Sequence, residues 1–339
     1  MSRILLRVDF NNPYEYRINA TLPTIRALLK KGHFVTLITH FEKDGKYPHL
    51  DQIARYLKKY FPSLVFIKGE IKKADPLIFS KQSKLFLLDN LRLSKGETSN
   101  DIKFARILAS WGDFYINEAF AVSHRKHTSL VGLPKLLPHE MGPLFKSEVH
   151  NLSKFFKPRH PFLFVLGGKK FETKEPLIKK FLRSADAIFV GGMTGNTFLA
   201  YRGIGVGKSF VEKVKIPENI LWSPKIFLPE DWESKNEIIY DAGLKTIKSL
   251  KGLAVKAKFV LWNGTFGWVE GGYEKGTRDF ARALGKSKAF RVIGGGDTVD
   301  AIRRYKLEKN FDFISTGGGA MLEFLAKGTL PGIEALKKK

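Results

Sequence analysis

The chain has 339 residues, of which 43% are apolar, so it is long enough for about two ordinary domains with sizeable cores. It carries 58 lysines and arginines against 33 aspartates and glutamates, and the formal charge of +25 favours anionic partners: phosphometabolites, nucleotides, nucleic acid or acidic lipid. The absence of cysteine excludes a disulfide framework, a thiolate metal site and a cysteine nucleophile.

The N-terminal apolar run is short and is interrupted by Arg3, Arg7 and Asp9. It therefore lacks the uninterrupted apolar centre of a secretory signal and is typical of a first strand. No apolar run approaches the roughly 18 residues needed to cross a bilayer. We expect a cytoplasmic protein without a membrane segment.

In the first half, short apolar runs alternate with helical patterns, as in parallel sheets covered by helices on both faces. We expect strands at residues 4–8, 34–39, 64–67, 85–88 and 114–116. Helices are expected at residues 22–31, 50–60 and 101–111, the last of them capped by Asn100. A longer helix at 143–157 ends at Pro158.

The pattern then restarts, with strands expected at residues 162–166, 187–190, 225–228, 259–262, 290–293 and 311–314. The fold class is α/β, with two doubly wound, Rossmann-like parallel-sheet domains joined by a hinge helix. The expected parts are an N-terminal domain 1–142, an interdomain helix 143–157, a C-terminal domain 158–327 and a segment 328–339 that can return to the N-terminal domain.

Three glycine clusters follow predicted strands in the second half, where helices begin: residues 191–195, 294–298 and 317–320. Glycine lets the backbone turn tightly and approach a ligand, and the free N–H groups of the next helix attract phosphate. Each cluster alone is equally compatible with a simple strand-to-helix turn. Three of them at the carboxyl ends of strands in one domain favour a ligand crevice.

Asp297 directly follows one of these glycine runs. A carboxylate there suits a Mg²⁺ ion that bridges nucleotide phosphates, because Mg²⁺ prefers one or two carboxylates together with substrate oxygens and water. The position equally suits an aspartate that caps the helix, and spacing alone does not separate the two roles. Thr298 offers a hydroxyl and an N–H group to the same phosphate.

The segment Gly-Gly-Lys-Lys-Phe-Glu-Thr-Lys at 167–174 follows the buried run at 162–166. We expect Lys170 and Lys174, four residues apart, to begin the next helix on one of its faces. Two lysines there oppose the helix dipole, a conflict that an anionic ligand relieves. The alternative is a solvated lysine-rich face.

Basic residues in the first half lie at or just beyond the ends of predicted strands. Arginine pairs bidentately with carboxylate and with phosphate, so these residues suit a pocket for a small anion that carries both groups. The candidates are Arg7, Arg17, His40, Lys43, Arg92, His124 and Arg125. No convincing Ser-His-Asp arrangement can be read from the spacing.

Eight short motifs occur in a specific order. They are Arg-Val-Asp-Phe-Asn at 7–11, the segments 87–92 and 117–127, Gly-Gly-Lys-Lys at 167–170, Trp-Asn-Gly at 262–264, and the segments 294–298, 315–320 and 330–332. Their order and approximate spacing resemble those of the phosphoglycerate kinase family, and the resemblance covers nearly the whole chain. It implies a phosphotransferase that exchanges a phosphoryl group between 1,3-bisphosphoglycerate and MgADP, giving 3-phosphoglycerate and MgATP.

The resemblance also implies roles for individual residues. Those expected to bind 3-phosphoglycerate are Asp9, Asn11, Arg17, His40, Arg92 and Arg125. Those expected to bind the nucleotide are Lys174, Gly192, Asn263, Glu270, Gly295, Gly296, Asp297 and Thr298, with Asp297 holding Mg²⁺ and Glu270 near the ribose. Those expected at the transferring phosphoryl group are Arg17, Lys170, Gly318 and Gly319.

The implied chemistry explains why no general base is found, since the attacking carboxylate or β-phosphate is already anionic near pH 7. In-line transfer then depends on positioning and charge neutralisation after hinge closure of the two domains, which excludes water. We expect a monomer whose partners are these small molecules. The alternatives are a basic nucleic-acid-binding protein or an inactive scaffold of the same fold, and both leave the site lysines and Asp297 unexplained.

The chain departs from the family pattern at several places. The loop between Asn11 and Arg17 and the region 203–230 are shorter than usual, and Thr265 replaces a proline. The turn at 40–44 reads His-Phe-Glu-Lys-Asp, which places Lys43 where an arginine is usual. These departures imply weaker contacts to the substrate and to the adenosine.

Overall fold

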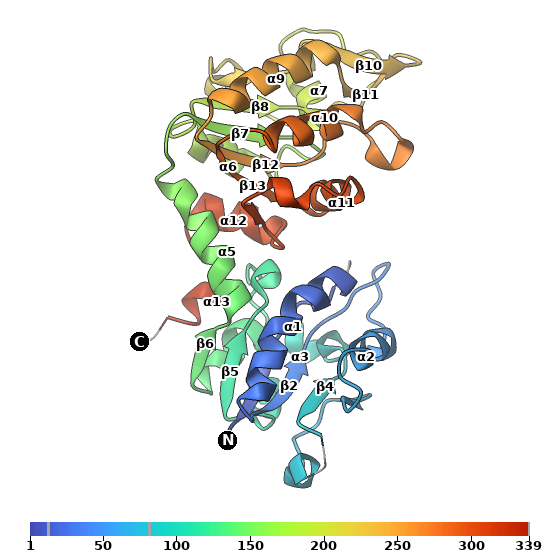
Figure 1. Cartoon of the computed structure of the whole chain (residues 1–339), viewed down its shortest axis with the longest axis vertical. Coiled ribbons are helices and arrows are strands. Elements are labelled where there is room, and N and C mark those ends of the chain that lie inside the picture. The colour runs from blue at the N-terminus through green and yellow to red at the C-terminus, as the bar shows by residue number, and fades with distance from the viewer. Residues whose placement is uncertain (12–13, 81–82, 338–339) are drawn as a thin grey trace. The chain divides into compact units, whose positions relative to one another are not determined.

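The computed structural model describes residues 1–11, 14–80 and 83–337. Residues 12 and 13 of the short loop before Arg17, and the last two residues of the lysine tail, lie outside the described residues. The chain forms two compact units, drawn in Figure 1. Unit 1 comprises Met1–His150 and Thr329–Lys339, and unit 2 comprises Asn151–Gly328.

Among the described residues of unit 1, six strands form a parallel sheet in the order β3-β4-β2-β1-β5-β6. The strands are β1 (Arg3–Arg7), β2 (Phe34–Ile38), β3 (Val65–Ile67), β4 (Leu85–Leu88), β5 (Phe114–Asn117) and β6 (His139–Met141). The helices are α1 (Tyr14–Lys30), α2 (Asp51–Lys58), α3 (Lys95–Thr98), α4 (Ile102–Ala109), α5 (Pro143–Ser153), which continues into unit 2, and α13 (Pro331–Glu334).

Both faces of this sheet are buried at its central strands, which explains why β2 and β4 are largely continuous apolar runs. Leu6 and Val8 pack in one cluster with Ile18 of α1 and Ile53 of α2. Leu5 points to the opposite face, because successive side chains alternate along a strand, and it is also fully buried.

In the described part of unit 2, six further strands form a parallel sheet in the order β14-β13-β12-β7-β8-β9. The strands are β7 (Phe162–Leu166), β8 (Ala187–Val190), β9 (Ile226–Phe227), β12 (Phe259–Asn263), β13 (Phe290–Gly294) and β14 (Phe313–Ile314). The helices are α6 (Glu175–Phe181), α7 (Gly192–Tyr201), α8 (Glu218–Leu221), α9 (Leu244–Lys256), α10 (Lys275–Leu284), α11 (Gly296–Arg304) and α12 (Gly319–Lys327).

An antiparallel hairpin accompanies this sheet, formed by β10 (Trp232–Lys235) and β11 (Ile238–Ala242). Asn236 and Glu237 connect its strands with φ of 52° and 64°, the left-handed backbone that a tight two-residue hairpin turn requires. The sequence analysis did not predict this hairpin.

The predicted α/β class with two doubly wound parallel sheets is confirmed. Three details of the prediction are wrong. The first helix begins at Tyr14 and carries Pro23 in its interior, whereas we expected it to begin at residue 22. Asp101 caps α4 by accepting from the Phe104 N–H at 2.7 Å, whereas Asn100 has a φ of 56° and is not the cap. Strand β6 was not expected.

Among the described residues, every helix is too short or too polar to cross a bilayer.

Candidate active site

In unit 2, glycine turns follow three neighbouring strands, β7, β12 and β13, at the same edge of the sheet. Hydrogen bonds join these turns to one another. The Gly167 N–H donates to the Asn263 carbonyl at 2.8 Å, and the Asn263 side-chain amide donates to the Gly294 carbonyl at 2.8 Å. The Gly264 N–H donates to the Thr298 hydroxyl at 2.7 Å. The sheet edge thus holds Asn263 and Thr298 in fixed positions beside the start of α11.

Two of the predicted glycines are required by the close approach of the chain to itself. Gly192 has a φ of 59°, and a Cβ there would stand 2.6 Å from the Gly168 nitrogen. Gly295 has a φ of 99°, and a Cβ would stand 2.7 Å from the Asn263 amide nitrogen. A larger residue at either position meets both backbone strain and a steric clash.

The two predicted lysines do not share a helix face, so that expectation is wrong. Helix α6 begins only at Glu175, and Lys170 lies before it in an exposed turn with a left-handed φ of 62°. The strain of this backbone, about 1 kcal/mol or more for a residue with a Cβ, is typical of functional loops.

Lys174 is buried, with its ammonium beneath the glycine loop. It donates to the Gly167 carbonyl, to the Lys169 carbonyl at 2.6 Å and to the Thr194 hydroxyl at 3.2 Å. Burial lowers the pKa of Lys174 to about 8, against the opposing attraction of Glu212 and Asp297. Among the described residues, the three hydrogen bonds of this buried cation all go to uncharged oxygens.

Asp297 lies in the first turn of α11 with an exposed side chain and lines a cavity of about 570 Å³. Among the described residues, no three histidine, aspartate or glutamate side chains are close enough to form a metal site by themselves. A divalent cation at Asp297 would therefore take its other ligands from a bound molecule and water. That donor set suits Mg²⁺.

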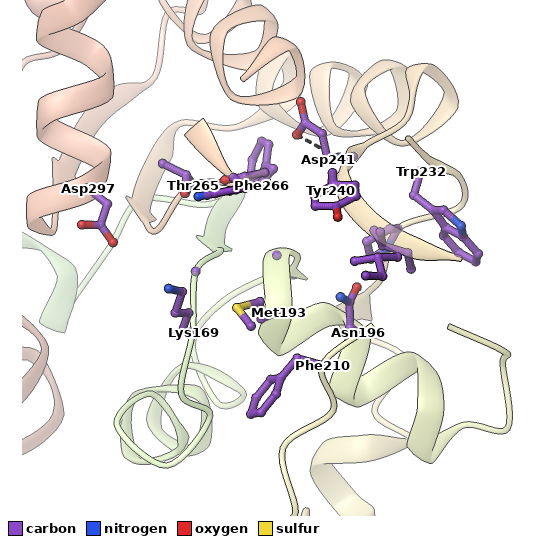
Figure 2. Close-up of a pocket in the computed structure, with 18 of the residues that line it drawn as sticks. Lys169, Met193, Asn196, Phe210, Trp232, Tyr240, Asp241, Thr265, Phe266 and Asp297 are labelled. Atoms are coloured by element: carbon purple, nitrogen blue, oxygen red, sulfur yellow. Dashed lines mark hydrogen bonds between the residues drawn. The ribbon is translucent and has the colours of Figure 1, made fainter. Parts of the chain in front are cut away.

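The cavity has a charged end and an aromatic end (Figure 2). Lys169 and Asp297 lie at the left of the view, and Trp232 and Tyr240 lie to its right. Its size falls in the range of ordinary small-molecule sites. Predicted residues that line it include Gly192, Glu270 and Asp297.

The aromatic wall of this cavity was not expected from the sequence. Tyr240 comes from the unexpected hairpin and stacks on Tyr273 with ring centroids 4.4 Å apart and on Trp268 at 6.0 Å. Trp268 leaves 54% of its surface exposed. Asn196 on α7 also lines the cavity. The signal available in the sequence was the β-branched and aromatic run Ile238–Tyr240 directly after Asn236 and Glu237.

Gly318 and Gly319 begin α12 beyond β14. A Cβ at either position would meet no atom within 4 Å, so the space beside these two α-carbons is open. This opening leaves room for an anionic group at the start of the helix.

In unit 1, the contact with Arg7 determines which ring nitrogen of His40 carries the proton. The Arg7 side chain is fully buried; its Nε donates to the Ser129 hydroxyl at 2.9 Å, and its Nη2 lies 3.3 Å from His40 Nδ1. Because arginine can only donate, Nδ1 must accept, and the proton of the neutral imidazole lies on Nε2. No described residue forms a hydrogen bond with the buried His40 Nε2, so within the described part of the chain it is a donor that lacks an acceptor.

Burial and the positive charges around it keep His40 neutral. Burial is the largest cause of a pKa well below the ordinary histidine value, and the positive charges of Arg7, Arg92 and Arg17 lower it further, with His127 also contributing. Burial likewise lowers the pKa of His127 to about 4, with Arg92 and Arg7 adding to the shift. These mutual effects show that the basic residues converge on one region of unit 1.

Two predicted arginines in this region already have acidic partners. Arg17 pairs with Asp9, and Arg92 pairs with Glu42. Asn11 accepts a hydrogen bond from the Glu42 N–H at 3.0 Å. Glu42 was not predicted as a site residue.

Arg125 is half-buried in the turn after the 3₁₀ helix Phe120–Val122. Its N–H donates to the Val122 carbonyl at 3.0 Å. Lys43, the arginine replacement, lies exposed in the turn after His40.

The basic region beside one parallel sheet and the glycine turns with Lys174 and Asp297 beside the other suit two anionic ligands, and with the family match below they identify a phosphotransferase. A family model described as phosphoglycerate kinase matches residues 1–328. The chain belongs to the phosphoglycerate kinase family.

Individual relatives agree along their full length. The phosphoglycerate kinase of Finegoldia magna is 34% identical over 99% of this chain and 96% of its own, and that of Moorella thermoacetica is 35% identical over the same shares. Among solved structures, the phosphoglycerate kinase from Coxiella burnetii has a TM-score of 0.82 at 31% identity and covers 99% of this chain and 96% of its own. That from Pyrococcus horikoshii OT3 has a TM-score of 0.87 at 30% identity, over 98% and 95%.

Proposed function

We propose that this chain transfers a phosphoryl group reversibly between 1,3-bisphosphoglycerate and MgADP, giving 3-phosphoglycerate and MgATP. Membership of the family over the full chain supports this activity. The observation in the structure that carries the proposal is the unit 2 cavity, in which an aromatic end and a charged end share one space of nucleotide size.

The nucleotide assignment follows from the character of the two ends. Trp268 and Tyr240 present ring faces on which a base can stack, and Glu270 is available to ribose hydroxyls. The phosphates would lie at the other end, near Lys174 and the N–H groups that begin α11. A bound phosphate would supply the anion that the buried Lys174 ammonium lacks.

The acid substrate is assigned to unit 1. His40 offers an unpartnered Nε2–H donor, and Arg17, Arg92 and Arg125 offer guanidinium groups to carboxylate and phosphate oxygens. Asp9 pairs with Arg17 and holds it in the region of His40. We assign Asn11 to the same site because its side-chain oxygen accepts a hydrogen bond from the Glu42 N–H, two residues after His40.

The reaction needs no proton abstraction by the protein, because both attacking oxygens are anionic near neutral pH. The work of the side chains is to hold the donor and acceptor oxygens in line and to neutralise charge on the phosphoryl oxygens. We assign this neutralisation to Arg17, Lys170 and the N–H groups of Gly318 and Gly319. Lys170 suits the task because it is exposed on a strained turn.

Asp297 is the residue that would hold Mg²⁺ with the nucleotide phosphates. The cation, when bound, neutralises phosphate charge and orients the phosphate chain.

We further propose the domain roles that the sequence predicts. Residues 1–142 form the acid-binding domain, 158–327 the nucleotide-binding domain and 143–157 the hinge, with 328–339 associated with the first domain. Because the two ligands bind to different domains, transfer requires a closing motion that also excludes water from the acyl phosphate. We assign the protein to the cytoplasm as a monomer.

A coupled assay with 3-phosphoglycerate and MgATP tests the proposal. The parent should turn over, and Arg17→Ala and Lys170→Ala should each lose about 100-fold or more in kcat, as when one preorganised charge-stabilising group is removed. Lys95→Ala, an exposed lysine of unit 1, is the matched control and should retain parental kcat. No turnover in a folded parent would refute the activity, and full turnover in both variants would refute the residue assignments.

A further inference from the structure

A carboxylate of the protein itself lies within the basic region of unit 1. Glu42 pairs with Arg92, a residue assigned above to the acid substrate. The Arg92 side chain is only 5% exposed, whereas the Glu42 side chain is 36% exposed. Glu42 therefore lies on the solvent side of the guanidinium and covers it.

The backbone around Glu42 holds the carboxylate in this position. The chain reverses directly after Glu42, where Lys43 and Lys46 exchange backbone hydrogen bonds of 3.0 and 2.9 Å. The two connecting residues, Asp44 and Gly45, have φ of 51° and 72°, as in a tight hairpin turn. Directly before the turn, the Glu42 N–H donates to Asn11 Oδ1.

The same hairpin places Tyr47 over the guanidinium, with the ring centroid 5.2 Å from the central carbon of Arg92. Arg92 is thus covered by an aromatic ring and a carboxylate from one short segment. Its Nε is buried, and no group of residues 1–11, 14–80 or 83–337 forms a hydrogen bond with it. A carboxylate–guanidinium pair of this kind is what an anionic substrate would form with Arg92.

We propose that Glu42 is an affinity-determining residue that competes with the substrate for Arg92. This inference rests on the proposed function of unit 1. A carboxylate or phosphate oxygen of the substrate binds Arg92 by exchange: the Glu42 carboxylate leaves the guanidinium for water and the substrate oxygen replaces it. The side chain can make this movement by rotation, because it is already one-third exposed while its backbone stays anchored.

A substitution that merely damages the site would weaken anion binding, whereas the proposed exchange predicts the opposite change. Removal of the Glu42 charge frees Arg92 and should strengthen anion binding. Since an accessible ion pair is worth up to about 1 kcal/mol, we expect Glu42→Gln to lower KM for 3-phosphoglycerate roughly three- to fivefold. KM for MgATP, which is assigned to unit 2, should not change.

Three variants make the test specific. Glu70→Gln removes the same charge from a fully solvated pair with Lys72 in the same unit and should leave KM for 3-phosphoglycerate unchanged. Glu42→Ala should reproduce the effect of Glu42→Gln. In an Arg92→Met background, Glu42→Gln should have no effect on KM, because the competition acts through Arg92.

Inorganic sulfate provides a readout that does not depend on turnover. Its dissociation constant, measured by calorimetry, should fall in Glu42→Gln relative to the parent and to Glu70→Gln. An unchanged or weaker affinity for sulfate and a raised KM in folded Glu42 variants would overturn the proposal and would mean that Glu42 instead orients Arg92. If sulfate binds more tightly to Glu42→Gln than to the parent but the parent fails to phosphorylate 3-phosphoglycerate, the proposed function is refuted and the exchange at Arg92 still stands.

Discussion

The buried ammonium of Lys174 makes the stability of unit 2 depend on pH in a defined direction. Its pKa is about 8 in the folded chain, compared with 10.5 for an ordinary lysine. Between these values the unfolded chain binds more protons, so the free energy of unfolding rises with pH. This rise in the free energy of unfolding begins near pH 8 and is complete above about pH 10.5.

The magnitude follows from the size of the shift. Each pKa unit corresponds to about 1.4 kcal/mol, so charging the buried side chain costs the fold about 3 kcal/mol at pH 7. Lys174→Met removes this cost but also removes the hydrogen bonds to Gly167, Lys169 and Thr194, which are worth a similar total. The difference between parent and variant at pH 7 should therefore be small.

The change with pH is the sharper test. From pH 7 to pH 9.5 the parent should gain about 2 kcal/mol of unfolding free energy relative to Lys174→Met. Urea unfolding followed by tryptophan fluorescence measures this, since four of the five tryptophans lie in unit 2. Lys169→Met, on an exposed side chain of the same loop, should follow the parent. Parallel curves for the parent and Lys174→Met across this range would refute the reasoning.

Three further predictions concern the nucleotide site. At pH 8.5, MgADP binding should be accompanied by the uptake of about 0.7 proton, because the bound phosphate restores the charge of Lys174. Calorimetry in two buffers of different ionisation enthalpy measures this uptake. The Lys174→Met variant should not show it. Trp268→Ala should raise KM for MgATP about tenfold by loss of a stacking face, with KM for 3-phosphoglycerate unchanged; equal rises in both would contradict the assignment. Gly192→Ala should lower the Tm and weaken MgADP binding, because its Cβ would meet Gly168. Gly203 has a similar φ but open space around it, so Gly203→Ala should lower the Tm through backbone strain alone and keep the affinity for MgADP.

The strands could be predicted where burial alone determines them. The runs that form β4, β7 and β8 are continuously apolar because helices cover both faces, and their predicted and observed bounds coincide. Strand β6 consists of His139–Met141, whose side chains are polar or only half-buried, so no apolar run marks it. Its pairing with β5 is a tertiary effect.

Two other elements were missed for local reasons. The apolar spacing that begins at Leu22 predicted a helix start at that residue, yet α1 begins at Tyr14 and continues through Pro23. The hairpin turn uses Asn236 and Glu237, although glycine is the commoner residue for such a backbone.

The site residues also divide into those whose position could be predicted from the sequence and those whose contacts could not. Residues whose position follows from the backbone, such as Thr298 and Asp297 after a glycine turn, lie where the sequence predicts, at the start of α11. The orientation of Lys174 and the pairing of Arg92 with Glu42 could not be predicted, because they depend on side chains that meet only in the folded chain.

Binding of each ligand alone tests the central claim most directly. Calorimetric titrations with 3-phosphoglycerate and with MgADP should each give one site on the parent. His40→Ala should lose affinity for 3-phosphoglycerate at least about tenfold and retain MgADP, because it removes an otherwise unpartnered donor from unit 1. Asp297→Asn should lose MgADP affinity and retain 3-phosphoglycerate. If either variant weakened both ligands equally, or neither of them, the division of the two ligands between the two units would be wrong.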